Sequence, residues 1–179
     1  MPDIEDSALV VVDVQGKLAQ LMHEKDILFK NVQILIKAAG ILDIPILWCQ
    51  QCPESLGPTI PDIAELLTGS HPINKASFSC CGAPDFNDAL DKLSRRHIIL
   101  CGIETHVCLY QTAADLLAEG YSVDVIADAV SSRTLANKQI ALERLAAEGA
   151  NISSTEMTLF DLLKTADHPK FREIAKLIK

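Results

Sequence analysis

The chain has 179 residues, of which 49% are hydrophobic and 22% are charged, and its formal net charge is -8 at pH 7. This length and apolar content predict one domain, residues 1–179, with a sizeable core. The charges are dispersed rather than gathered in blocks, which argues against nucleic acid or an anionic membrane as a partner. No apolar run reaches the roughly 18 to 20 residues of a membrane helix, and the N-terminus lacks the pattern of a secretory signal, so we expect a cytoplasmic protein.

Hydrophobic periodicity predicts strands that alternate with helices. Short apolar runs rich in β-branched residues indicate buried strands, and apolar residues at helical spacing indicate amphipathic helices. In chain order the predicted elements are strand 8–14, helix 27–42, strand 45–49, short strand 73–75, helix 86–93, strand 97–101, helix 109–117, strand 122–127, helix 135–147, a helix capped by Ser153 with Glu156, and helix 171–178. This alternation is typical of a parallel sheet covered by helices on both faces.

Ligands of open α/β sheets bind beyond the carboxyl ends of the strands, so reactive side chains at those ends are candidate site residues. Asp13 is one, because a carboxylate near the end of a buried strand is costly unless it is paired or hydrogen-bonded. The alternative is a structural carboxylate that accepts N–H groups of the next turn. Gln15, two residues later, is either a ligand donor or a part of the same turn.

Cys108 is a second candidate, because it lies at the start of a predicted helix. The helix dipole and free N–H groups there favour the thiolate and lower the thiol pKa below about 8.5, and they can stabilise an oxyanion. The alternative is that Cys108 is a small buried hydrophobic residue.

Lys75 is a third candidate if residues 73–75 form a strand, since an ammonium near a thiol and a carboxylate stabilises the thiolate. The alternative for Lys75 is a solvated surface lysine.

The chain has six cysteines, which we expect to be reduced at this length and location. The Cys49-x-x-Cys52 spacing is compatible with a structural zinc site or with a redox-active cysteine pair. There is no second such motif, however, and the adjacent Cys80 and Cys81 have poor chelating geometry, so we expect no metal.

Three separated motifs, ALVVVDVQ, NKASFS and CGIETHVCLYQTA, occur in this order. Together they resemble the isochorismatase-like cysteine hydrolases, a superfamily that includes nicotinamidases and other small amidases. The resemblance runs from about Ser7 to about Thr158. Residues 53–62, 126–133 and 167–179 further resemble the isochorismatase-domain-containing branch, whose members mostly lack an assigned substrate.

The resemblance implies a three-layer α/β/α Rossmann-like fold with a six-stranded parallel sheet in the order 3-2-1-4-5-6. Asp13 matches the general acid/base of the family, Lys75 the lysine of its catalytic triad, and Cys108 its nucleophile. The resemblance also implies a cis peptide bond between Ile103 and Glu104, which aims the N–H of Glu104 alongside that of Cys108 as an oxyanion hole.

The implied activity is hydrolysis of a small amide-type molecule through a thioester acyl-enzyme, without a cofactor. Nicotinamidases carry an Asp-x-His metal cluster after the second strand, where this chain has CQQC at 49–52, so the metal site of that subgroup is missing. Isochorismatases proper cleave a vinyl ether and do not keep the nucleophilic cysteine, so Cys108 argues against isochorismate as the substrate.

Further expectations concern partners and alternatives. His106 lies two residues before Cys108, and such positions diverge on a helix, so it is expected to line the pocket or to contact a neighbouring subunit. Members of the superfamily are usually dimers or larger, which implies a homo-oligomer, with the loop 56–62 and the C-terminal helix as candidate contacts. Two alternatives from other classes stay open: a non-catalytic binding or scaffold protein, and a redox sensor in which Cys108 is oxidised.

Overall fold

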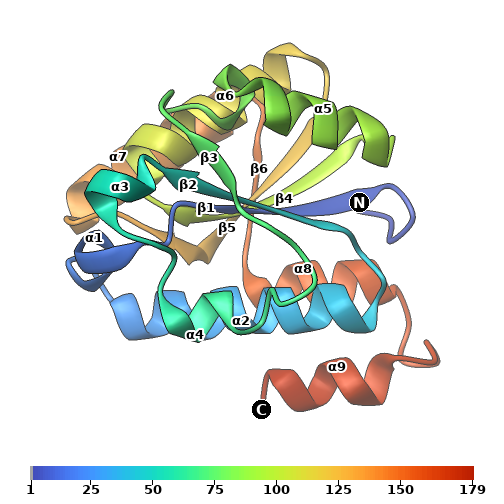
Figure 1. Ribbon diagram of the computed structural model, residues 1–179. Coiled ribbons are helices and arrows are strands. Elements are labelled where there is room, and N and C mark those ends of the chain that lie inside the picture. The colour runs from blue at the N-terminus through green and yellow to red at the C-terminus, as the bar shows by residue number, and fades with distance from the viewer. Residues whose placement is uncertain (1) are drawn as a thin grey trace.

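The computed structural model describes residues 2–179 as a sheet between two layers of helices (Figure 1). The sheet has six parallel strands in the order β3-β2-β1-β4-β5-β6, so the implied fold and strand order are confirmed. The strands are β1 (Ser7–Val12), β2 (Ile46–Gln51), β3 (Ile73–Lys75), β4 (His97–Ile103), β5 (Ser122–Ser131) and β6 (Asn151–Ser153).

Helices cover both faces of the sheet. On one side lie α2 (Lys25–Ile41), α4 (Pro61–Ala64), α8 (Thr155–Leu163) and α9 (Phe171–Leu177), and on the other side lie α5 (Pro84–Leu93), α6 (Tyr110–Ala118) and α7 (Leu135–Ala147). The remaining short elements are α1 (Gly16–Gln20), α3 (Pro53–Leu56), the turn η1 (Cys80–Gly82) and the π-helical turn η2 (Thr105–Leu109). The long predicted helices are thus confirmed, with ends shifted by one or two residues.

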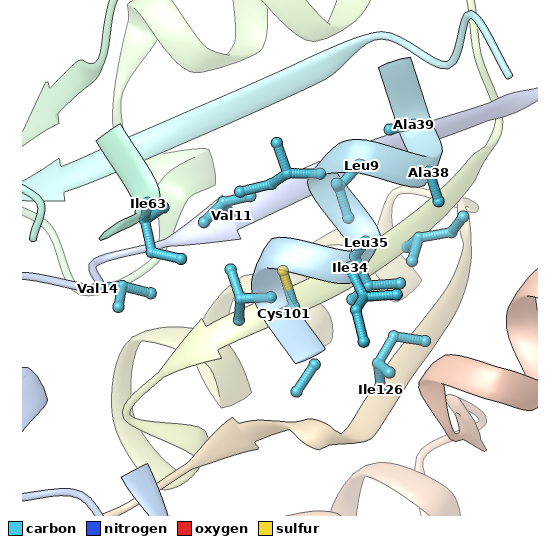
Figure 2. Close-up of a cluster of buried hydrophobic side chains, with 14 of the residues drawn as sticks. Leu9, Val11, Val14, Ile34, Leu35, Ala38, Ala39, Ile63, Cys101 and Ile126 are labelled. Carbon is cyan, nitrogen blue, oxygen red and sulfur yellow. The ribbon is translucent and has the colours of Figure 1, made fainter. Parts of the chain in front are cut away.

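Each face of the sheet has its own hydrophobic core. Figure 2 shows part of the core under α2, where side chains from β1, β4, β5 and the helix meet, among them Leu9, Val11, Ile34, Leu35, Cys101 and Ile126. The second core packs α5, α6 and α7 against the opposite face of the same strands. Within residues 2–179, none of the helices combines the length and the apolar character that crossing a bilayer needs.

Two local predictions are wrong. Asp13 does not belong to the first strand, because its φ of 50° turns the chain out of the sheet directly after Val12. Ser154 rather than Ser153 caps α8, with its Oγ accepting the N–H of Met157 at 3.2 Å, because β6 keeps Ser153 extended. The sequence reading also missed α1, α3, α4 and β6, which are three to five residues long and too short to show a period.

Gly102 allows β4 to approach β1 closely at the rim where the candidate residues gather. Its φ is 118°, and a Cβ atom at this position would overlap the carbonyl oxygen of Val12, its partner across the β1–β4 ladder. L-residues rarely adopt that φ, so both the backbone and the contact require glycine.

We expect Gly102→Ala to lower the free energy of unfolding by more than about 4 kcal/mol, because it combines a left-handed backbone with an overlap inside the sheet. Gly40→Ala is the matched control, since a Cβ atom there meets nothing within 4 Å. In α2 this change should raise stability by up to about 1 kcal/mol. Urea unfolding of both variants measures the difference, and equal effects would contradict the assignment.

Candidate active site

Asp13 and Lys75 form a buried ion pair at the carboxyl end of the sheet. Lys75 is the last residue of β3, Asp13 follows β1, and the distance from Lys75 Nζ to Asp13 Oδ2 is 2.7 Å. Their side chains are 0% and 3% exposed. The surface-lysine alternative is therefore wrong, because this ammonium is enclosed by the protein.

The ammonium of Lys75 has acceptors on every side. Besides Asp13 it donates to Gln51 Oε1 at 2.7 Å, to the carbonyl oxygen of Phe78 at 2.9 Å and to that of Ser77 at 3.3 Å. Burial lowers the pKa of Lys75, but the charge of Asp13 and other nearby groups raise it, and the net shift is upward. Lys75 therefore stays a cation whose hydrogen-bonding capacity is already used.

Asp13 keeps one carboxylate oxygen free. Its Oδ1 is buried and has no hydrogen-bond partner among residues 2–179. Burial raises the pKa of the Asp13 carboxyl, and the neighbouring charge of Lys75 only partly opposes this. This oxygen can therefore still accept a proton, as a general base must.

Cys108 faces the same space from the turn η2, between the end of β4 and the start of α6. Its Sγ lies 3.9 Å from Gln51 Oε1. Burial, and next the charge of Asp13, raise the pKa of the Cys108 thiol to about 12, and the charge of Lys75 opposes this only in part. The expectation of a lowered pKa is thus wrong, because burial and a facing carboxylate favour the neutral thiol.

Gln51 is a site residue that the sequence reading missed. It ends β2, its Oε1 accepts from Lys75, and its Nε2 donates to the carbonyl oxygen of Ala76 at 2.7 Å. The signal was the one used for Asp13, a polar residue at the end of a buried strand. In the sequence this signal is hidden by the CQQC spacing, which suggests a metal site instead.

A cavity of about 120 Å³ opens beside the thiol. Its polar walls are Asp13, Gln51, Glu104 and Cys108. The carboxylate of Asp13 and the sulfur of Cys108 therefore face one small cavity. A substrate carbonyl group would have to lie in this cavity for the sulfur to attack it.

The turn before Cys108 contains the cis peptide bond between Ile103 and Glu104, at the position that the family resemblance implies. The carboxylate of Glu104 is directed to Arg133, accepting its backbone N–H at 3.0 Å and its Nε–H at 3.1 Å. Within the described part of the chain, the backbone N–H of Glu104 donates to no acceptor outside the regular elements.

The structure does not place Gln15 and His106 on the cavity walls. Gln15 donates from Nε2 to the carbonyl oxygens of Gly57 at 2.7 Å and Gln51 at 3.1 Å, so it ties α3 to β2. His106 contacts Ser132 through Nδ1 at 3.0 Å and approaches Asn137 through Nε2 at 3.4 Å. Both side chains are held by neighbouring loops and helices rather than directed to the thiol.

All six cysteines are free thiols. Across residues 2–179 the structure contains no group of three or more His, Cys, Asp and Glu side chains arranged to hold a metal ion. The Sγ atom of Cys52, the second cysteine of the CxxC motif, lies 3.7 Å from the carbonyl oxygen of Lys75.

Comparison with known proteins identifies a family. The isochorismatase domain model matches residues 7–157. Isochorismatase domain-containing protein 2A of Mus musculus is 38% identical over 176 residues, which are 98% of this chain and 84% of that protein. The secreted isochorismatase effector Isc1 of Phytophthora sojae is 38% identical over 178 residues, 97% of this chain and 84% of its own.

Solved structures show the same fold. The MAR1 ribonuclease of Caenorhabditis elegans superposes with a TM-score of 0.93 at 39% sequence identity. The match covers 99% of this chain and 91% of the ribonuclease chain. The YcaC gene product of Escherichia coli, described as an octameric hydrolase of unknown specificity, also has a TM-score of 0.93. The match covers 99% of this chain and 88% of the YcaC chain. Because the sequences are only 23% identical, the likeness concerns the fold alone.

The pKa of Cys108 predicts how the thiol reacts with iodoacetamide. With a pKa of about 12, the alkylation rate of Cys108 should rise about tenfold per pH unit from pH 6 to 9, without a plateau. Asp13→Asn removes the facing negative charge, so it should lower the pKa and speed alkylation at a fixed pH. Peptide mass spectrometry resolves Cys108 from the other cysteines. A plateau below pH 9 in the unmodified chain would show a preformed thiolate.

Proposed function

The chain belongs to the isochorismatase domain family, and from this premise we propose that it is a cysteine hydrolase of small amides that works through a thioester on Cys108. Membership of this family of hydrolases supports hydrolysis in general. The observation that supports the finer proposal is the free Oδ1 of Asp13, buried and unpartnered, on the wall of the cavity that Cys108 also lines.

In the proposed reaction Cys108 Sγ attacks the substrate carbonyl carbon while its proton passes to Asp13. Because the thiol is neutral at rest, proton transfer accompanies the attack, and the raised pKa of Asp13 favours it. The oxyanion is stabilised by the backbone N–H groups of Glu104 and Cys108. Asp13 then protonates the leaving nitrogen, and afterwards deprotonates the water that hydrolyses the thioester.

The raised thiol pKa weakens the redox-sensor alternative, since peroxide reacts with thiolates and Cys108 carries little thiolate near neutral pH. A binding or scaffold protein has no use for an unpartnered buried carboxylate oxygen beside a thiol, because that atom costs stability.

The nematode relative is named a ribonuclease, which raises RNA as a second class of substrate. Binding RNA relies on cations that neutralise phosphates. This chain has a net charge of -8, and the ammonium of Lys75 next to the cavity is already used by four acceptors. These features favour an uncharged amide over RNA.

The single domain spanning residues 1–179, the homo-oligomeric state and the cytoplasmic location stay predictions from the sequence.

Turnover of an amide panel tests the proposed reaction. We expect Cys108→Ala to abolish it, because the nucleophile is lost, and Asp13→Asn to lower kcat by about 10²–10⁴-fold, because the base is lost. Cys81→Ala is the matched control, since this half-buried cysteine lies outside the cavity walls. Circular dichroism confirms folding of each variant.

Intact-protein mass spectrometry during turnover should reveal an acyl adduct on Cys108. Robust turnover of an amide by the Cys108→Ala variant would contradict the proposed mechanism. Cleavage of RNA that survives Cys108→Ala, with no amide hydrolysed by the unmodified chain, would favour the ribonuclease activity instead.

A further inference from the structure

The cavity next to Cys108 is small. Its volume is about 120 Å³, somewhat less than an apolar cavity of about 150 Å³ that binds benzene in another protein. The volume therefore matches an acyl group of up to about six non-hydrogen atoms, and the atoms of a longer group would lie beyond the walls.

Apart from Asp13, Gln51, Glu104 and Cys108, the walls of the cavity are apolar. Leu18, Leu56, Phe78, Ile103 and Val107 supply them. Burying a hydrocarbon acyl group against these side chains is favourable, whereas burying a charged group there costs several kcal/mol unless a partner charge is provided.

No charge of the cavity wall is available to pair with a charged acyl group. Glu104 is engaged by Arg133, and Asp13 is engaged by Lys75. Lys75 itself is saturated, so a substrate carboxylate would meet the Asp13 carboxylate without a compensating cation. A substrate ammonium would lose its hydration in exchange for a carboxylate whose charge Lys75 already neutralises.

The walls are also held in place. Gln15 donates to the carbonyl oxygen of Gly57, next to Leu56. Gly16, with φ 44°, lies so close to Leu56 that a Cβ atom would overlap its carbonyl oxygen. Lys75 donates to the backbone carbonyl of Phe78 at 2.9 Å, which fixes the position of that wall relative to the catalytic pair.

From this geometry we propose the substrate class of the site: primary or simple secondary amides whose acyl group is uncharged, apolar and no larger than about six non-hydrogen atoms. The proposal rests on the amide hydrolysis proposed above. Phe78 limits the size, because it lines the cavity and is itself 53% exposed, so it lies at the mouth of the cavity.

The experiment compares kcat/KM for acetamide, butyramide, isobutyramide, hexanamide and octanamide, together with succinamic acid as an anionic amide and 4-aminobutyramide as a cationic one. We expect a maximum at about four to six acyl atoms, with octanamide and both charged amides at least about tenfold lower. Phe78→Ala should move the maximum toward hexanamide and octanamide, because it opens the wall.

Phe160→Ala is the matched control. It removes another exposed phenylalanine, on α8, whose ring packs on Phe171 and not on the cavity. Its chain-length profile should equal that of the unmodified protein.

The outcomes separate the two proposals. If no amide is hydrolysed and no acyl adduct forms on Cys108, the hydrolase proposal fails and the substrate class fails with it. If a charged or long amide is the best substrate of the unmodified protein, only the substrate class is overturned. A chain-length profile that Phe78→Ala leaves unchanged overturns the assignment of Phe78 as the limiting wall.

Discussion

The buried pair of Lys75 and Asp13 is the interaction on which the site depends. Two charges withdrawn from water cost several kcal/mol each, so they persist only with good mutual geometry and with their remaining groups hydrogen-bonded. Lys75 meets this condition through Gln51 and the carbonyls that follow it at Ser77 and Phe78. One ammonium thereby positions the base, a polar wall and the aromatic wall of the cavity.

The strand order makes this pair possible. Because β3, β2, β1 and β4 are parallel, their carboxyl ends reach one rim, and Lys75 can span from β3 across β2 to the residue after β1. The positive φ of Asp13 turns it out of the strand, and Gly102 lets β4 approach β1 at the same level. The local backbone conformation and the strand order of the sheet therefore together determine where these few residues lie.

The sequence was sufficient for features that repeat along the chain or belong to one strand end. The sheet, the long helices and the gathering of Asp13, Lys75 and Cys108 follow from periodicity, parallel topology and family resemblance. The sequence did not indicate the role of Gln51, the position of Phe78 at the cavity or the raised pKa of Cys108, because each results from contacts between segments far apart in the chain. Nearness in sequence to Asp13 and Cys108 does not bring Gln15 and His106 to the cavity walls, because their side chains bond to neighbouring loops and helices.

The raised pKa of Cys108 changes how the proposed chemistry uses charge. At rest the negative charge is on Asp13, paired with Lys75, and the sulfur is neutral. When the thiol proton moves to Asp13 during attack, the negative charge passes to the substrate oxygen, so the net charge of the enclosed site is conserved. Nothing charged has to enter or leave a region where charges are costly. The nucleophile is then generated only while a carbonyl is present to receive it, which also keeps the sulfur in its less oxidisable form between turnovers.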